Sequence, residues 1–326
     1  MNRRISVIIP NYNSASTIGK CIETAFSSRY ENFEIVVVDD CSTDNSADII
    51  GKFPCRFIRL DRHYGASRAR NTGAENSSGE ILFFIDADCI LQENTLELVN
   101  KAFDRAEDII TGGTYTLLPY NNDFFSTFQS IFINYFETKC DEPDYIATHA
   151  MAVAPDIFKK AGGFSEDFLP ILEDIEFSHR LKKLGYRLKT IPEISVQHIF
   201  NFTLIKSLKN AFRKSMYWTI YSLKNKDLLA DSGTASAELK INVVSYFFIV
   251  FFLLLYAFLK INILLIAILP VITFNLYINR RLLTAFYKAK GLAFGLSAAL
   301  YYTMLYPLSV GTGSLYGIVR YLYNFK

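Results

Sequence analysis

Two long apolar stretches constrain the fold of this chain more than any other feature of its sequence. Residues 241–259 (INVVSYFFIVFFLLLYAFL) and 261–278 (INILLIAILPVITFNLYI) contain no charged side chain and are separated only by Lys260. About 20 apolar residues in a helix are enough to cross the hydrocarbon core of a bilayer. We therefore predict a transmembrane helical hairpin. The alternative, two buried helices of a soluble domain, is disfavoured because neither stretch has a polar face.

A third uncharged stretch, residues 291–319, contains Pro307 and several glycines. It is predicted to form either one long kinked helix or a helix followed by an interfacial segment. Together the three stretches define a membrane domain over residues 241–326, with spans at about 241–259, 261–278 and 291–319.

Charge is distributed unevenly along the chain. Residues 1–202 carry 20 Lys and Arg against 29 Asp and Glu, whereas residues 203–326 carry 14 against 3. A basic and apolar C-terminal part is typical of a membrane protein rather than of a nucleic-acid-binding protein. Seven basic residues lie between residue 203 and the first span, and four lie in the predicted loop 279–290. By the positive-inside rule, a multi-pass protein is predicted whose N-terminal domain and 279–290 loop face the cytoplasm.

The segment before the first span has an amphipathic pattern. In residues 203–224 (TLIKSLKNAFRKSMYWTIYSLK), apolar side chains recur every four residues and lysines and arginine occupy other positions. Two interpretations stay open: a helix that lies on an anionic bilayer surface, or a helix that packs on the preceding domain. We assign residues 203–240 to this interfacial helix and a linker.

The N-terminal part alternates short apolar runs with longer helical patterns. Runs such as ISVIIP, FEIVVVDD and ILFFID are apolar on consecutive residues and are separated by segments such as SASTIGKCIETAFSS. This alternation is typical of a mostly parallel sheet that is covered by helices on both faces. Residues 1–202 are therefore predicted to form a Rossmann-like α/β domain.

Each of these apolar runs ends on polar residues. PNYN follows the first run, DDCSTDNS the second, and Asp86-Ala87-Asp88 the third. In open α/β sheets ligands bind outside the carboxyl ends of the strands, so the three ends are predicted to line one site. A D-x-D sequence alone is more often a turn or a helix cap. Here it ends a buried strand beside two other polar ends, which favours a ligand site.

Five sequence blocks then occur in a fixed order: SVIIPNYN, EIVVVDDCSTDNS, GASRARNTGA, ILFFIDADCIL and GGFSEDFLPILEDIEFSHRLKKLGYRL. Together they resemble family 2 of the inverting glycosyltransferases over roughly residues 4–200. The resemblance implies the GT-A fold and the transfer of a hexosyl group from a UDP-, GDP- or dTDP-sugar.

The resemblance also implies roles for the residues of the D-x-D sequence. Asp86 would approach the ribose and the metal, Ala87 would stand between the carboxylates, and Asp88 would ligate the metal directly, with His198 completing the site. Chemistry agrees, because a departing diphosphate needs a compensating cation and a carboxylate pair suits Mg²⁺ or Mn²⁺. A lone histidine is more often structural than a metal ligand, so both interpretations of His198 stay open.

The nucleotide is expected at the first two strand ends. By resemblance Asp40 would contact the base or ribose, and Pro10 and Tyr12 would frame the base. Arg68 or Arg70 of the RARN sequence would face the donor, and Arg68 is taken as the candidate. A carboxylate at the second strand end could instead cap the following helix.

The predicted catalytic base lies in the sequence ILEDIEFSHR. Glu173, Asp174 and Glu176 open a helix, and their mutual repulsion should raise at least one pKa. The family's E-D block makes Asp174 the base. An acidic first turn favoured by the helix dipole is the alternative explanation for Glu173 and Glu176.

Two groups of residues are given more ordinary interpretations. His63, His149 and His179 are predicted to be surface or acceptor-side residues. The aromatic residues between 124 and 136 have helical spacing, and they either pack in a core or contact lipid. The members of this aromatic series are Phe124, Phe125, Phe128, Phe132, Tyr135 and Phe136.

The sequence as a whole predicts a membrane-anchored, metal-dependent inverting glycosyltransferase of cell-envelope polysaccharide or glycan biosynthesis. The predicted acceptor is the hydroxyl of a lipid-linked saccharide, because a hydroxyl needs a base. The alternative is a polyprenyl-phosphate sugar synthase, since a lipid phosphate is already ionised. Processive synthesis is not expected, because only FRKSMYW stands where such enzymes have Q-x-x-R-W. A dinucleotide-binding dehydrogenase is excluded because G-x-G-x-x-G is missing after the first strand.

Overall fold

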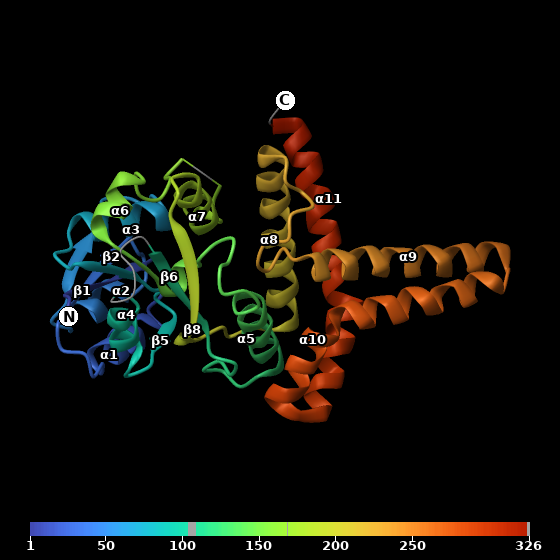
Figure 1. The fold of residues 1–326 in the computed structure, drawn as a ribbon, viewed down its shortest axis with the longest axis horizontal. Helices are drawn as coiled ribbons and strands as arrows, with labels where there is room; N and C mark the ends of the chain where they lie inside the picture. The colour runs from blue at the N-terminus through green and yellow to red at the C-terminus, as the bar shows by residue number, and fades with distance from the viewer. Residues whose placement is uncertain (104–108, 168, 325–326) are drawn as a thin grey trace. The chain divides into compact units, whose positions relative to one another are not determined.

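The structure is a computed structural model that describes residues 1–103, 109–167 and 169–324 (Figure 1). The chain forms two compact units. The α/β unit comprises Met1–Asn122 and Glu137–Asn201, and the helical unit comprises Asp123–Phe136 and Phe202–Lys326. One boundary between the two units lies between Asn201 and Phe202, and the segment Asp123–Phe136 groups with the helical unit.

The α/β unit is built on one mixed sheet. Among the described residues its strand order is β3-β2-β1-β4-β7-β6-β8-β5. The strands are β1 Ile5–Asn11, β2 Phe33–Asp39, β3 Arg56–Arg59, β4 Ile81–Phe84, β5 Cys89–Leu91, β6 Ile109–Tyr115, β7 Met151–Val153 and β8 Arg187–His198. Strands β3, β2, β1 and β4 are parallel, as the alternating pattern predicted. Strand β7 runs antiparallel to both β4 and β6, and β5 runs antiparallel to β8.

Helices of the α/β unit pack on this sheet. They are α1 Ile18–Phe26, α2 Ser46–Ile50, α3 Ala66–Glu75, α4 Thr95–Phe103, α6 Pro155–Lys160 and α7 Glu173–Lys183, with a 3₁₀ turn η1 at Thr148–Ala150. Ile8 of β1 and Phe84 of β4 pack in one core with Phe177 of α7. Helix α3 approaches β1 through Gly73, where a Cβ atom would collide with the Ile8 side chain. Consecutive strand residues are buried because helices and neighbouring segments cover the sheet.

The helical unit contains α5 Phe124–Glu137, except for its last residue, and the helices after residue 202. These are α8 Leu204–Asn225, α9 Ala237–Leu259, α10 Ile263–Leu300, a π-helix η2 Tyr301–Leu305 and α11 Tyr306–Asn324. Helix α5 joins this unit because its aromatic face packs there: the Phe128 ring lies 5.0 Å from that of Phe286 and 4.8 Å from that of Tyr301. The core-packing interpretation of the aromatic series therefore applies to Phe128.

One feature of the helical unit differs from the prediction. Within residues 279–290, which were predicted to form a loop, the residues up to 289 are helical and continue α10. The stretch 291–319 is a continuous helical segment that begins at a kink, where Lys290 and Gly291 leave helical geometry and Gly291 has a φ of 81°. The π-helix precedes Pro307, whose missing N–H interrupts the regular hydrogen-bond ladder. Two helical segments, Ala237–Leu259 and Ile263–Tyr323, are long and apolar enough to cross a membrane.

Candidate active site

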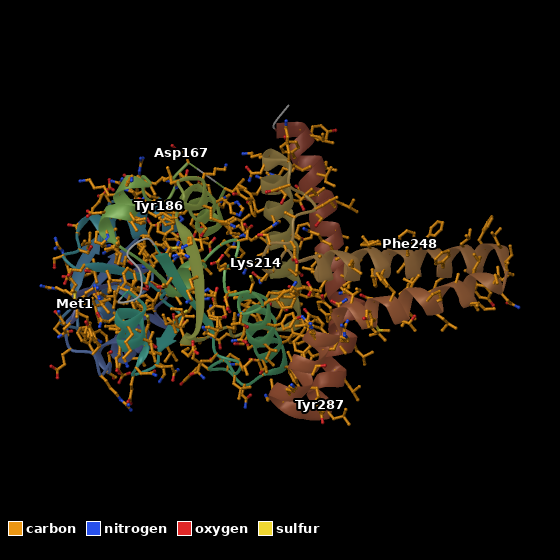
Figure 2. The ribbon with its side chains drawn as sticks, in the orientation of Figure 1. Met1, Asp167, Tyr186, Lys214, Phe248 and Tyr287 are labelled. Carbon is orange, nitrogen blue, oxygen red and sulfur yellow. The ribbon has the colours of Figure 1, made fainter. Side chains whose placement is uncertain are left out.

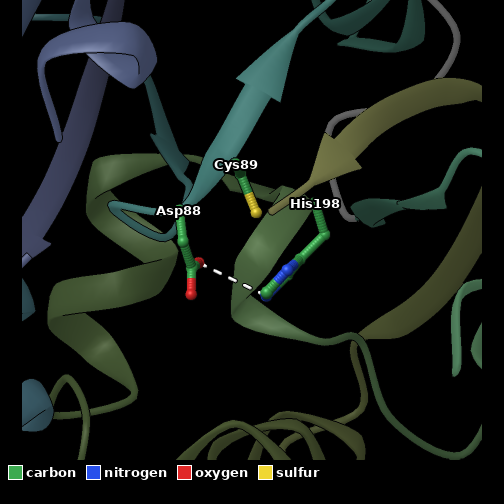
Figure 3. A group of neighbouring side chains, drawn as sticks. All are labelled: Asp88, Cys89 and His198. Atoms are coloured by element: carbon green, nitrogen blue, oxygen red, sulfur yellow. Dashed lines mark ion pairs between the residues drawn. The ribbon is translucent and has the colours of Figure 1, made fainter. Parts of the chain in front are cut away.

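The pairing of β5 with β8 brings the D-x-D sequence and His198 together. Cys89 is the register partner of His198, and the Ile199 amide donates to the Asp88 carbonyl oxygen at 2.9 Å. As a result, the Asp88 carboxylate lies 3.4 Å from His198 Nε2 (Figure 3). One ligand atom from each of Asp88, Cys89 and His198 lies within 4.8 Å of the others.

The donor set of this cluster fits a divalent cation. A carboxylate oxygen and an imidazole nitrogen are ligands that Mn²⁺ accepts readily, whereas Mg²⁺ prefers oxygen alone. Burial raises the pKa of the Cys89 thiol well above its usual value, and the carboxylates of Asp88 and Asp86 add to the effect. A protonated thiol is a poor ligand for a hard cation, so Asp88 and His198 are the ligands that this geometry supports.

The two carboxylates of the D-x-D sequence have different electrostatic environments. Burial, together with the negative charge of Asp86, raises the pKa of Asp88 to about 7. Burial would also raise the pKa of Asp86, but the Arg70 guanidinium lowers it below its usual value. Asp86 is thus kept ionised by the protein itself, whereas a cation bound at Asp88 would stabilise the ionised form of that residue. Ala87, between them, is buried.

Arg70 links the D-x-D sequence to the predicted catalytic helix. Its Nη2 donates to Asp86 Oδ1 at 2.7 Å and its Nη1 to Glu173 Oε1 at 2.6 Å, and its side chain is 5% exposed. Arg68, the predicted donor-binding arginine, instead pairs with Glu166 at 3.4 Å. Residues two positions apart point to different sides of a helix, so only one of the two arginines can face Asp86.

The predicted base, Asp174, lies in the first turn of α7 directly after Glu173. The turn is preceded by Leu172, which adopts a left-handed backbone with a φ of 78° that is uncommon for leucine. The Asp174 carboxylate accepts a hydrogen bond from the Ile175 amide at 2.9 Å. Because Arg70 holds the neighbouring Glu173, the first turn of α7 is tied to Asp86.

A second group around His149 was not anticipated from the sequence. The ring of His149 stacks on Tyr115 with centroids 3.9 Å apart, and Tyr115 presents its edge to His198 at 4.9 Å. His149 Nε2 lies 3.3 Å from a Glu137 carboxylate oxygen. Burial would lower the pKa of His149, but the charge of Glu137, and then those of Asp86 and Asp174, raise it. The prediction of a surface position is wrong for His149, which is 6% exposed.

A third group lies at the ends of β1 and β2. Tyr12 stacks on His63 with centroids 3.9 Å apart, and His63 Nδ1 lies 2.8 Å from Asp40. Asp40 also accepts hydrogen bonds from the amides of Tyr64 and Gly65, at 2.8 and 2.7 Å. Asp40 and Tyr12 therefore come together as predicted, and His63, predicted to be a surface or acceptor-side residue, joins them.

The capping alternative for the carboxylates at the second strand end is not observed. Helix α2 has Asn45 as its N-cap residue, without a side-chain cap bond. Asp39 instead accepts hydrogen bonds from Asn11 Nδ2 at 2.7 Å and from Ser42 Oγ at 2.5 Å. The bond from Asn11 links the end of β1 to the end of β2. Pro10 precedes Asn11 in β1, next to Val38 of β2.

Comparison with protein families decides the identity of the chain. The model for "Glycosyl transferase family 2" matches residues 6–154, and the model for "Glycosyl transferase family group 2" matches residues 81–319, more than half of the chain. The chain belongs to the family 2 group of glycosyltransferases. The family and the enzyme class predicted from the five sequence blocks are confirmed.

Curated relatives of this glycosyltransferase carry related names. Glycosyltransferase GlyG of Streptococcus pneumoniae serotype 4 is 32% identical over 131 residues, 38% of this chain and 44% of the relative. Glycosyltransferase AglE of Haloferax volcanii is 29% identical over 192 residues, 56% of this chain and 63% of the relative. The matched segment thus spans less than two thirds of each. WfaP of Escherichia coli, named as a UDP-Glc:α-D-GlcNAc-diphosphoundecaprenol β-1,3-glucosyltransferase, is 40% identical over 87 residues, 26% of this chain and 35% of the relative.

A solved structure shows the same fold. Mannosyltransferase PcManGT of Pyrobaculum calidifontis, solved in complex with GDP-Man and Mn²⁺, superposes with a TM-score of 0.61 and 17% identity, covering 99% of this chain and 88% of that one. The predicted GT-A fold of the glycosyltransferase is therefore confirmed, including a helical C-terminal region.

Proposed function

We propose that this glycosyltransferase is anchored in the cytoplasmic face of a membrane and transfers a sugar from a nucleotide-sugar donor to the hydroxyl of a lipid-linked saccharide. The transfer is inverting, non-processive and dependent on a divalent cation. The observation that supports it most is the juxtaposition of Asp88 and His198 with Asp86, which Arg70 connects to the helix of Asp174.

The donor would bind along the ends of β1, β2 and β4. Tyr12 and His63 offer a stacked aromatic surface for the base, held in place by Asp40. Asp88 and His198 would hold Mn²⁺ or Mg²⁺. When bound, the cation compensates the charge of the diphosphate as it departs. The solved mannosyltransferase of the same fold, with GDP-Man and Mn²⁺, supports a metal of this kind.

In the chemical step, Asp174 accepts the proton of the acceptor hydroxyl while the hydroxyl oxygen attacks the anomeric carbon. The new glycosidic bond forms as the bond between the anomeric carbon and the diphosphate oxygen breaks, in a single displacement. Arg70 positions the turn that bears Asp174, because it holds Glu173 and Asp86 at once.

The acceptor class is supported by a relative and by the apolar helices. The name of WfaP specifies a saccharide linked to diphosphoundecaprenol as its acceptor. In this chain, α9 and α10 supply the apolar segments that would hold the enzyme at the membrane where such lipids reside. The same helices also favour the second candidate, a synthase that uses polyprenyl phosphate itself as acceptor.

Donor hydrolysis by the purified full chain tests the metal-dependent part of this proposal. A panel of UDP-, GDP- and dTDP-sugars is incubated with Mn²⁺, Mg²⁺ or a chelator, and the released nucleoside diphosphate is measured. We expect one donor class to be hydrolysed with metal only, and Asp88→Asn to abolish the activity. Asp156→Asn, an exposed carboxylate in the first turn of α6, is the matched control and should behave like the wild type. Hydrolysis that is insensitive to both the chelator and Asp88→Asn would contradict the metal assignment.

A further inference from the structure

In the α9–α10 hairpin, residues 237–278, each helical arm is long enough to cross a membrane once. Between Lys240 and Lys260, α9 carries no charge and is about 20 residues long, which corresponds to about 30 Å of helix. Phe248 and Phe251 on α9 and Ile266 on α10 are among its exposed apolar side chains. Figure 2 shows Phe248 standing out from the hairpin surface. A soluble protein would not expose a surface of this kind to water.

After the hairpin, the chain changes direction at Gly291. The φ of 81° there breaks the helix. Gly295 then packs on the backbone of Tyr287, since a Cβ atom at position 295 would lie 3.1 Å from the Tyr287 Cα atom. Residues 292–324 continue as one helical rod through the π-helix and α11. At about 1.5 Å per residue this C-terminal rod is about 50 Å long, well beyond the thickness of a hydrocarbon core.

The C-terminal rod runs beside α8. A Cβ atom at Gly313 would collide with the Phe212 backbone of α8, and one at Gly317 would lie 2.6 Å from the Met216 carbonyl oxygen. Gly313 faces Phe212 and Gly317 faces Met216, four residues further on each helix, so the two helices are parallel. Small residues at this spacing allow close helix contact in membrane proteins. In Figure 1, α8 and α11 run across the direction of the hairpin.

Helix α8 has a charge pattern that is incompatible with the hydrocarbon core. Its exposed basic residues are Lys206, Lys209, Arg213, Lys214 and Lys224. Charged side chains are unfavourable at the centre of a membrane helix, so a helix with five of them belongs at the surface. The rod beside it has an exposed apolar stripe at four-residue steps: Leu292, Leu296, Leu300, Met304 and Leu308. An exposed apolar stripe beside a basic helix is typical of a membrane interface.

A closed ring of hydrogen bonds fastens the base of the hairpin to the rod. Asn242 Nδ2 donates to the Tyr302 carbonyl oxygen at 2.7 Å, and Tyr302 Oη donates to Asn279 Oδ1 at 2.9 Å. Asn279 Nδ2 donates to Asn275 Oδ1 at 2.8 Å, and Asn275 Nδ2 donates to Asn242 Oδ1 at 2.9 Å. The ring lies two residues from Lys240 and one from Arg280, which places it at the charged end of the hairpin.

We propose that the C-terminal rod does not cross the membrane but lies in its surface beside α8, with the apolar stripe in the lipid and the cations of α8 near anionic headgroups. The chain then crosses the bilayer twice, through α9 and the first part of α10. The C-terminal end of the rod consequently lies on the same side of the membrane as the α/β unit. The inference rests on the membrane attachment proposed above and replaces the third span that the sequence predicted.

The side on which the two ends lie tests the number of crossings directly. Green fluorescent protein, which fluoresces only in the cytoplasm, and alkaline phosphatase, active only outside, are fused in turn before residue 1 and after residue 326 of the full chain. Two crossings place both ends on one side, so the same reporter is active at both positions. Different active reporters at the two ends would mean an odd number of crossings and would overturn the inference.

Depth measurements separate this inference from membrane attachment itself. Trp218 is the one tryptophan of the chain, so Trp218→Phe gives a background for single probes. In vesicles of phosphatidylcholine and phosphatidylglycerol, Leu296→Trp and Leu315→Trp should be quenched by bromine near the headgroup, and Phe251→Trp by bromine near the chain ends. Deep quenching at Leu315→Trp would overturn the surface position. Phe251→Trp without any quenching would instead remove the membrane attachment of the hairpin.

Discussion

Arg70 is the residue on which the geometry of the site most depends. Buried at 5% exposure, it pairs with two carboxylates from different elements. We expect Arg70→Met to lower the free energy of unfolding by about 3–5 kcal/mol, because two carboxylates lose a buried partner. Arg70→Lys should recover only part of the loss, since an ammonium cannot make the same forked contact. Denaturant unfolding of the purified chain measures both.

The control for Arg70 is two residues away on the same helix. Arg68 is partly exposed and pairs with Glu166 at 3.4 Å, so Arg68→Met should change stability by no more than about 1 kcal/mol. Equal losses of stability in Arg68→Met and Arg70→Met would contradict a special stabilising role for the contacts of Arg70 with Asp86 and Glu173.

Asp174 separates the two acceptor classes. If the nucleophile is a hydroxyl, Asp174→Asn removes the proton acceptor and should lower the rate by about 10²–10⁴ with donor affinity nearly unchanged. A phosphate acceptor is already ionised, so the same variant should then lose less than about tenfold. The measurement is transfer of radiolabelled sugar into the lipid fraction at saturating donor. Glu176→Gln, in the same helical turn and paired with Arg180, is the matched control.

Single residues show where sequence reasoning succeeded and where it could not. The family resemblance made His198 a candidate to complete the metal site at Asp88, beside an open structural interpretation, and the structure places the two side chains 3.4 Å apart. Arg68 was taken as the donor-facing arginine, but which of Arg68 and Arg70 faces Asp86 could not be predicted, because helical phase relative to the sheet depends on packing. His149 was missed because nothing in its own sequence surroundings indicates that Tyr115 and Glu137, far along the chain, would surround it.

At the level of elements, the alternating N-terminal pattern predicted the parallel strands well. The antiparallel position of β7 between β4 and β6 was not predicted, because strand order depends on long-range pairing rather than on local sequence. Local sequence likewise does not show which unit α5 packs in. Its aromatic spacing predicts a helix, but only tertiary contacts such as those of Phe128 with Phe286 and Tyr301 reveal its partner.

The contact between α8 and α11 gives a prediction at this scale. Gly313→Ala would place a Cβ atom against the Phe212 backbone, which cannot move without displacing α8. We expect a loss of about 1–3 kcal/mol from this overpacking, despite the higher helix propensity of alanine. Thermal unfolding in detergent measures the effect. Thr312→Ala, the exposed neighbour on the same helix, should be close to neutral, and an equally stable Gly313→Ala would argue against the close contact.

Across the whole molecule, charge and hydrophobicity are segregated. The acidic residues concentrate before residue 203 and the basic ones dominate after it, where the apolar helices also lie. Two forces could therefore hold the chain at a membrane: insertion of the hairpin or attraction between basic residues and anionic lipids. They differ in their response to solution conditions, because salt screens charge but does not extract an inserted helix.

We expect insertion to dominate. The full chain should stay in the membrane fraction after washes with high salt and with alkaline carbonate, since the hairpin exposes apolar side chains along about 30 Å. A variant with Lys206, Lys209, Arg213 and Lys214 replaced by Gln keeps the hairpin and removes four cations of α8, so it should also stay. Sedimentation followed by immunoblotting measures the retained fraction. Release of the wild type by carbonate would contradict insertion, and release of the wild type by high salt would show that charge, rather than the hairpin, is the anchor.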